Sequence, residues 1–322
     1  MLKYIIRRVL VFIPMLLAIT AITYVLMVLL PGDPVTALID PFSLQEGISQ
    51  EYIDAQREKY GLNKPVPVRY VIWLGQLVRG NFGYSFMTGL PVIEMILGRL
   101  VPTLQLTFTA LILGTIGGII LGVIAALRQY SYYDYILSFI SLIGIAIPTF
   151  FLALIALFLV VLKVPLFPSH GWTTELGVYN LWDNLYHLML PAFILSIELL
   201  ATSTRFARTA MLEVMSSDYV TTARAKGLSE FWVIGRHAFR NALLPLITIS
   251  TMRLPILFGG ALVIESMFAW PGMGLFAVRA MVNADYPVLM GVAFVTALIV
   301  LLSNLLADIL YAVADPRIRT GN

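Results

Sequence analysis

Long, unbroken runs of apolar residues are the dominant pattern in this chain. A helix needs about 20 apolar residues to cross the hydrocarbon core of a bilayer. Six runs approach or exceed this length: residues 9–30, 102–127, 135–162, 188–204, 243–265 and 287–311. They are continuous rather than alternating, which indicates helices and argues against the strands of a β-barrel. The pattern therefore predicts an all-α integral membrane protein with six transmembrane helices. The fourth run is the least regular, because Glu198 interrupts it.

The first run follows Lys3, Arg7 and Arg8, an arrangement that also begins secretory signal peptides. The run is longer than a signal-peptide core, and no small-x-small cleavage site follows it. We expect residues 1–30 to form an uncleaved N-terminal transmembrane helix.

Basic residues predict the orientation of the spans, because cytoplasmic loops carry an excess of lysine and arginine. With the N-terminus inside, the cytoplasmic segments hold more than half of the 21 basic residues. These residues are Lys3, Arg7, Arg8, Arg128, Arg205, Arg208, Arg224, Lys226, Arg236, Arg240, Arg317 and Arg319. We therefore expect both termini to be cytoplasmic.

The polar stretches divide the chain into domains. Residues 31–101 are too long for a simple connection, so we expect an external, partly helical subdomain. Residues 102–311 are expected to form a five-helix transmembrane core with a cytoplasmic loop at 205–242. Residues 312–322 complete the chain as a cytoplasmic tail.

Composition narrows the class of protein. Hydrophobic residues make up 59% of the chain and charged residues 12%, about half of the charged share in soluble proteins. The absence of cysteine excludes disulfides and thiolate sites. The sequence contains no phosphate-binding G-x4-G-K-[ST] loop, no H-E-x-x-H and no G-x-S-x-G motif. The three histidines, far apart in sequence, form no metal-ligand pattern. We expect a chain that is not an enzyme and holds no metal or cofactor of its own.

A polar, basic stretch from Tyr219 to Leu228 lies between two spans. Ser217 or Asp218 can cap a short helix at its start, and Gly227 can end that helix in the left-handed conformation. A helix–Gly–helix element of this kind would present a rigid knob to a docking partner. The alternative is an ordinary basic loop whose arginines reach lipid head groups. The residues singled out here are Tyr219, Ala223, Arg224, Lys226, Gly227 and Leu228.

Small residues and a proline mark two other spans. Gly114, Gly118 and Gly122 recur every four residues, which lets helix backbones approach closely. This predicts tight packing within the bundle, with a homodimer seam as the alternative. Pro148 lies within the third run and is expected to kink the helix, either as a plain structural feature or as a gate.

Two ionisable residues lie within apolar runs, where charges are costly and usually face protein or water. Arg253 and Glu198 could line a translocation path, or they could pair and lock the bundle. Glu265, near the end of the fifth run, is expected to be structural.

Several segments taken together resemble the permease subunits of dipeptide and oligopeptide ABC importers, in particular the first of the two paralogous permeases. The segments are Tyr4–Arg8, Leu30–Pro34, Tyr60–Pro65, Gly80–Ser85, Arg99–Thr103, Tyr219–Leu228, Arg240–Pro245, Phe268–Gly274, Asp285–Pro287 and Asp315–Arg319. The resemblance covers the whole chain, and it is the ordered set rather than any one segment that is specific.

The resemblance implies a type I ABC importer permease fold in the plasma membrane of a prokaryote. It implies three kinds of partner besides the bilayer: a second permease, two ATPase subunits that bind ATP and Mg, and an external solute-binding protein. In the coupling motif of this superfamily, Glu-Ala-Ala-x3-Gly, the chain departs at Thr221 and Thr222 and keeps Ala223 and Gly227.

Peptides are the cargo that the resemblance favours. Arg253 stands where a small or uncharged polar residue is expected in this family. Short oligosaccharides, nickel and glutathione therefore remain alternative cargoes, and a secondary transporter is an alternative of another class.

Overall fold

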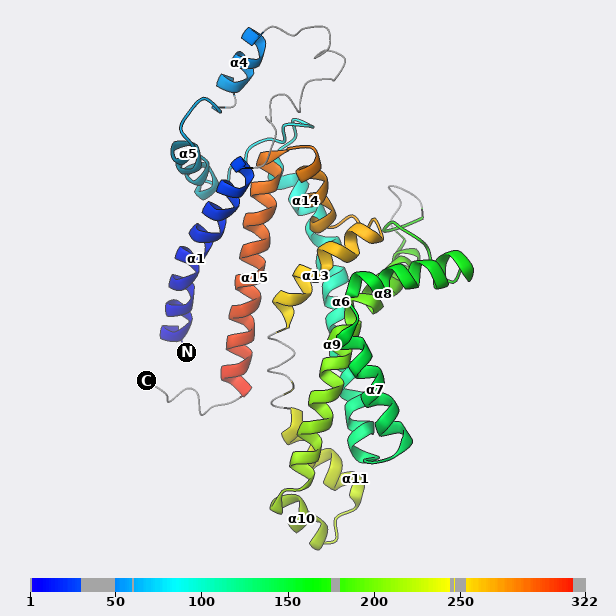
Figure 1. The fold of residues 1–322 in the computed structure, drawn as a ribbon. Coiled ribbons are helices and arrows are strands. Elements are labelled where there is room, and N and C mark those ends of the chain that lie inside the picture. Colours follow the sequence, from blue (N-terminus) through cyan, green and yellow to red (C-terminus); the bar gives the residue numbers. More distant parts are fainter. Residues whose placement is uncertain are drawn as a thin grey trace. The chain divides into compact units, whose positions relative to one another are not determined.

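A computed structural model describes residues 2–29, 50–59, 61–174, 180–243, 246 and 253–314 (Figure 1). Within these ranges every extended regular element is a helix, which confirms the all-α prediction. The elements are α1 (Leu2–Leu29), α4 (Gln50–Lys59), α5 (Val66–Val78), α6 (Val92–Leu127), α7 (Tyr132–Ala146), α8 (Thr149–Ala156), the π-helical η1 (Leu157–Lys163), α9 (Leu181–Met215), α10 (Asp218–Ala225), α11 (Glu230–Trp232), the π-helical η2 (Val233–Phe239), α13 (Leu254–Met267), α14 (Met273–Val282) and α15 (Tyr286–Ala314).

Four helices of the described residues are long and apolar enough to cross a membrane. The segments concerned are Ile6–Leu29, Val92–Leu127, Leu181–Met215 and Tyr286–Ile309. The helices on either side of Pro148 make a fifth if that bent pair is one span. The predicted count of six is thus not confirmed. The predicted fifth span, residues 243–265, is described only in part, because most of its first half lies outside the described residues. Its second half corresponds to α13, which has 14 residues and is shorter than a span.

The third predicted span differs from the expectation. Instead of one kinked helix, α7 and the α8–η1 helix are separate and bent by 104° at Pro148. Ile147 has an extended backbone, with φ −89° and ψ 125°. The ring of a proline disfavours helical geometry at the residue before it, so α7 ends and α8 begins beyond the proline.

The chain divides into two compact units. Unit 1 consists of residues 1–5, 102–271 and 300–322, and unit 2 consists of residues 6–101 and 272–299. The first helix from Ile6 onward and residues 272–299 therefore belong to the same unit as the segment 31–101.

The core of unit 1 forms around α9. This helix extends well beyond the predicted run 188–204, and α7, α8 and α13 all pack on it. Leu195 and Leu199 of α9 are buried with Leu106 of α6 and Ile264 of α13. α9 is thus the helix on which the rest of the unit is assembled.

Unit 2 has two smaller apolar clusters. In one, Val92 and Ile96 of α6 pack against α14 and α15. Gly291 permits this approach, because a Cβ there would lie 2.8 Å from a Val92 methyl carbon. In the other, Tyr24 and Met27 of α1 pack with Met290 of α15 and with residues of α5.

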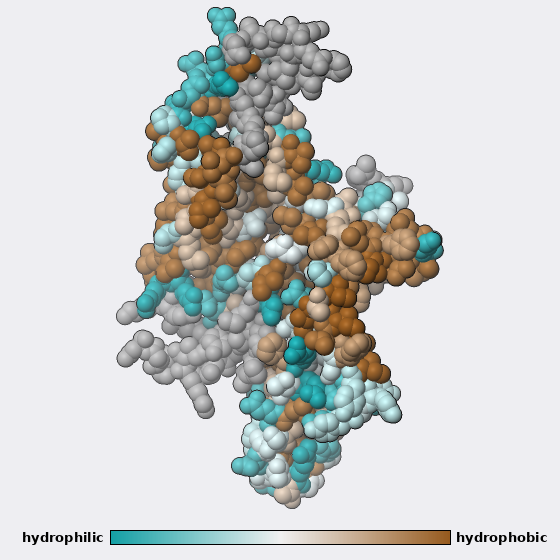
Figure 2. All heavy atoms as spheres, viewed as in Figure 1, coloured by the Kyte–Doolittle hydropathy of each residue, from teal (hydrophilic) through white to brown (hydrophobic). Residues whose placement is uncertain are grey.

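The surface shows where apolar side chains face outward. Figure 2 shows hydrophobic residues over α7 and α8, where Phe139, Leu142 and Phe150 are exposed. Around α10 and α11 the same view is mostly hydrophilic or intermediate. This contrast suits a lipid-facing surface in the first case and a water-facing segment in the second.

Candidate functional site

The candidate site in unit 1 is the segment 217–241, which we call the coupling segment. It contains α10, α11 and η2 and directly follows α9. Gly227 has a φ of +78°, the left-handed conformation predicted for it. Ser217 stands at the N-cap position of α10, but its hydroxyl donates to the Val214 carbonyl instead of accepting from the helix.

A small apolar core holds the coupling segment together. Val220 and Ala223 of α10 are buried against Val233 of η2, with Val214 of α9 beside them. Only two residues separate α9, which ends at Met215, from α10, which begins at Asp218. The segment is therefore packed directly on the end of α9, with little slack in the connection.

An ion pair bridges the turn at Gly227. Arg224 donates from Nε and Nη2 of its guanidinium group to the two Glu230 carboxylate oxygens, at 3.2 and 2.7 Å. These hydrogen bonds hold the pKa of Glu230 below its ordinary value and raise the pKa of Arg224. Because both groups are largely exposed, the pair orients the turn more than it stabilises the fold.

The six residues singled out from the sequence have different surroundings in the structure. Ala223 is buried and Arg224 is paired, whereas Tyr219 and Leu228 are exposed at 45% and 44%. Tyr219 also accepts a hydrogen bond from Asn241 at 3.2 Å. Lys226 ends α10, and Gly227 makes the turn. Five of the six residues are thus exposed to a partner, and only Ala223 is buried.

Sequence reasoning missed two residues of this surface. Phe231 and Trp232 are 80% and 55% exposed, and their rings meet edge to face at 6.2 Å between centroids. Two adjacent aromatic residues in an otherwise polar loop were the available signal. Aromatic side chains that stay exposed in a water-facing segment are typical of a protein-binding surface.

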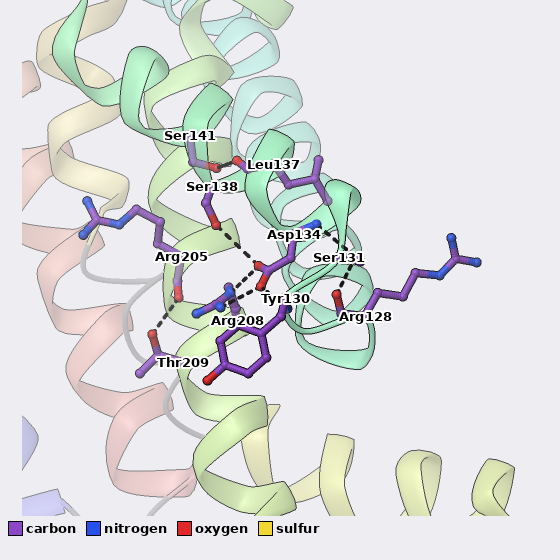
Figure 3. A network of polar contacts seen from close by, with 10 residues as sticks. All are labelled: Arg128, Tyr130, Ser131, Asp134, Leu137, Ser138, Ser141, Arg205, Arg208 and Thr209. Atoms are coloured by element: carbon purple, nitrogen blue, oxygen red, sulfur yellow. Dashed lines mark hydrogen bonds and ion pairs between the residues drawn. The ribbon is translucent and has the colours of Figure 1, made fainter.

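A buried ion pair fixes α7 on α9 (Figure 3). Arg208 donates from Nε and Nη2 to the two Asp134 oxygens at 2.6 and 2.8 Å, and Asp134 is 2% exposed. The backbone N–H of Tyr130 also donates to this carboxylate, at 3.0 Å. No local pattern in the sequence indicates this pairing, because the two residues are far apart along the chain.

Arg253 and Glu198 form an ion pair, with a guanidinium nitrogen 3.6 Å from a carboxylate oxygen. Their side chains are 33% and 47% exposed. The pairing is the one named as an alternative to a path-lining role. The partial exposure leaves both charges accessible, so the pair is compatible with either role.

The glycines of α6 lie against α9. A Cβ on Gly114 would come 2.9 Å from Leu199, one on Gly118 2.5 Å from Ser203, and one on Gly122 2.4 Å from the carbonyl oxygen of Thr204. Gly144 of α7 has a similar place, 3.0 Å from Ala201. The seam that these residues form is thus occupied by a helix of the same chain.

Segments that carried the resemblance meet within each unit. In unit 1, Trp270 donates from its indole to the Pro102 carbonyl at 2.9 Å, and Thr103 donates to the buried Glu265 carboxylate at 2.6 Å. In unit 2, Ser85 donates to the buried Asp285 carboxylate at 2.5 Å. The segments 99–103 with 268–274, and 80–85 with 285–287, are therefore structural pairs.

Comparison with known proteins agrees with this architecture. A family model described as "Binding-protein-dependent transport system inner membrane component" matches residues 118–320. A second one, described as "Binding-prot-dependent transport system membrane comp, N-term", matches residues 1–107.

Two relatives show how far the similarity extends. The chain is 44% identical over 319 residues to the oligopeptide transport system permease protein AppB of Bacillus subtilis, covering 99% of each chain. It is 36% identical over 337 residues to the dipeptide transport system permease protein DppB of Alkalihalophilus pseudofirmus, covering 99% of this chain and 100% of that one.

A solved structure shares the fold. The inward-facing MetNI methionine ABC transporter contains a chain that matches with a TM-score of 0.56 at 17% identity, covering 69% of this chain and 97% of that one. At this identity the match speaks for the fold alone, which is the type I importer permease fold. Taken with the family models and the full-length relatives, it shows that this multi-pass membrane protein belongs to the family of binding-protein-dependent transport system inner membrane components.

Proposed function

We propose that the chain is one of two paralogous permease subunits in an ATP-driven importer and forms half of its translocation pathway. The observation that carries this proposal is the coupling segment, a compact knob with exposed aromatic residues at the end of a long core helix. Two ATPase subunits would bind and hydrolyse ATP with Mg, and an external solute-binding protein would deliver the cargo. The chain itself would catalyse no reaction.

The packing of α9 supports a mechanical role for the coupling segment. The segment is packed on Val214 in the last turn of α9, and α9 continues as one helix of 35 residues into the core of unit 1. A displacement of the segment would therefore move α9 and the helices packed on it as a body. Differential contacts of the ATPases with two positions of the knob would bias the two states of the permease.

Di- and oligopeptides are the cargo that we propose, because relatives that match over their full length are named oligopeptide and dipeptide permeases. The Arg253–Glu198 pair presents two partly exposed charges that would complement the carboxylate and ammonium of a peptide or of glutathione. Pro148 would contribute to the same translocation pathway through the break that it makes in the third span, between α7 and α8. Short oligosaccharides, nickel and glutathione are the alternative cargoes.

Both termini and the coupling segment would lie in the cytoplasm, where the ATPases are. The excess of lysine and arginine in these parts of the sequence supports this orientation.

Gly227→Pro tests the coupling role. Proline cannot adopt the φ of +78° found at this position, so the turn between α10 and α11 would be lost while the membrane core is untouched. We expect the assembled importer to lose cargo-stimulated ATPase activity and uptake, with normal insertion of the chain. Gly235→Ala is the matched control, because a Cβ there meets nothing within 4 Å.

Normal uptake by the Gly227→Pro importer would contradict the coupling assignment. Uptake that persists when no ATPase subunit is present would instead favour a secondary transporter.

A further inference from the structure

A cavity of about 850 Å³ lies within unit 2, among α1, α4, α5, the loop at residues 82–86 and the start of α15. Nothing in the proposed transport cycle uses it. The residues of α5 that line it are Arg69, Ile72, Trp73 and Gln76, which the helical repeat places on one face.

α5 is held firmly against α1 beside this cavity. The Tyr70 hydroxyl donates to the Leu17 carbonyl at 3.1 Å and lies 2.9 Å from the Thr20 hydroxyl. The Tyr70 ring also meets Tyr24 edge to face, with centroids 5.5 Å apart. These contacts fix the rotation of α5, so the face that carries Arg69 and Trp73 is directed at the cavity by the fold.

The lining of the cavity has an excess of positive charge. Lys64 and Arg69 contribute to it, against the single carboxylate of Glu58; Arg57 also lines the cavity but is paired with Asp54 at 3.4 Å. Aromatic rings from Tyr24, Trp73, Tyr84 and Tyr286 form much of the remaining wall.

Two hydrogen-bond donors at the cavity have no acceptor among the described residues. The Nε of Arg69 and the indole Nε1 of Trp73 are both buried, and neither has a partner there. Buried donors are nearly always paired in folded proteins, because leaving one unpaired forfeits its hydration. A cationic pocket with two free donors is suited to an anionic acceptor group.

The cavity lies where two membrane spans end. Tyr24, Met27 and Val28 belong to the last six residues of the span Ile6–Leu29, and Tyr286 and Met290 to the first five of the span Tyr286–Ile309. This depth is the boundary between hydrocarbon and head groups, where tyrosine and tryptophan are enriched. On α1, Ile22, Leu26 and Leu29 expose their side chains at 60%, 60% and 72%, from just below the level of the cavity to the end of the span.

We propose that this cavity binds the phosphate head group of an anionic phospholipid, with the acyl chains along the exposed apolar face of α1. Arg69 and Trp73 would donate to the phosphate oxygens, and Lys64 would supply further positive charge. The aromatic walls would cover the glycerol region. The proposal does not depend on the cargo or on the coupling mechanism.

Native mass spectrometry of the full chain in mild detergent tests the proposal. The delipidated protein is offered phosphatidylglycerol or phosphatidylcholine, and the bound lipid is counted. We expect retention of phosphatidylglycerol over phosphatidylcholine, and a loss of about tenfold in phosphatidylglycerol affinity in Arg69→Gln, since a charge-assisted hydrogen bond is removed. Trp73→Phe keeps an aromatic ring at this position and removes the indole N–H donor, so a smaller loss is expected.

Arg79→Gln is the matched control. Arg79 follows α5 directly, is exposed and does not line the cavity, so the same change of charge should leave lipid binding unaltered. If Arg69→Gln does not give a folded protein on gel filtration, lipid binding is measured on Lys64→Gln instead. Lys64 is exposed, so its replacement does not disturb packing.

Three results would overturn the proposal. One is equal retention of the two lipids, and another is an equal loss in Arg69→Gln and Arg79→Gln. The third is displacement of the lipid by inorganic phosphate, or by a dipeptide, at concentrations close to that of the lipid. That outcome would assign the cavity to a soluble anion or to a peptide carboxylate.

Discussion

Single residues show how closely the helices of unit 1 are packed. α6 approaches α9 so closely that the hydrogen atom of a glycine is the largest side chain that fits at Gly118. In a bilayer no hydrophobic force drives helices together, so such contacts rest on close van der Waals packing. One added carbon therefore matters more here than at a lipid-facing position.

Gly118→Ala is expected to destabilise the chain by about 1–3 kcal/mol. The new Cβ would lie 2.5 Å from Cβ of Ser203 and 2.6 Å from the carbonyl oxygen of Leu200, and backbone cannot move aside cheaply. Gly98→Ala in the same helix meets nothing within 4 Å and should be neutral or slightly stabilising. Thermal unfolding in detergent measures both; equal midpoints for the two variants would refute the close contact.

The Asp134–Arg208 pair is the second residue-scale feature with a measurable consequence. Asp134→Leu should cost about 2–4 kcal/mol, because it leaves a guanidinium without its buried partner. The double variant Asp134→Leu/Arg208→Met should recover much of that loss, since it leaves no unpaired charge. A double-mutant cycle on thermal unfolding gives the coupling energy, and additive effects of the two single changes would contradict the pairing.

At the scale of elements, the coupling segment behaves as a small folded unit. Its apolar core of Val220, Ala223 and Val233 joins α10 to η2, and the Arg224–Glu230 pair closes the turn between them. The exposed rings of Phe231 and Trp232 project from this unit. A packed core makes the segment rigid, and exposed aromatic rings give it a binding surface. Both properties are needed to transmit a displacement from a bound partner to α9.

The pH dependence of this unit follows from the lowered pKa of Glu230. A carboxyl with a depressed pKa contributes above its unfolded pKa and loses that contribution as the pH falls through the folded value. The bridge should thus be constant from neutral pH to about pH 5 and weaken below about pH 4. Hydrogen exchange of residues 218–232, corrected for intrinsic rates, is measured in the natural chain and in Glu230→Gln. The two should differ at the pH values where the Glu230 carboxyl is ionised and should agree in acid, where it is protonated.

Glu213→Gln is the control for that comparison, because Glu213 is an exposed carboxyl of α9 just before the segment. A difference between the natural chain and Glu230→Gln that persists in strong acid would show that the ion pair is not its cause.

At the scale of the whole molecule, the proposed function makes this chain one subunit of a larger transport complex. Purified in mild detergent from its native host, the tagged chain should bring with it a second permease and ATPase subunits that carry phosphate-binding loops. The exposed surface of Tyr219, Leu228, Phe231 and Trp232 should be needed for the ATPases but not for the second permease. A Phe231→Ser/Trp232→Ser variant that retains the ATPases would show that they bind elsewhere. If the natural chain is recovered alone, that result would count against the proposal that it is an importer subunit.

The local pattern of this sequence determined the helical class, the membrane location, the absence of recognised catalytic motifs and the left-handed turn at Gly227. Each of these depends on residues that are neighbours along the chain: apolar runs, a missing motif, a glycine after a short helix. The order of its motifs also indicated the family, although no single motif did.

The tertiary structure decided what depends on residues far apart. It brought Asp134 to Arg208, Ser85 to Asp285 and Trp270 to Pro102, and no local period encodes which distant groups meet. It turned the kink expected at Pro148 into a break of 104°, because the rules for proline fix where a helix stops and not where the next one packs. It also exposed Phe231 and Trp232 and left the donors of Arg69 and Trp73 buried at a cavity, since burial is set by the packing of whole helices.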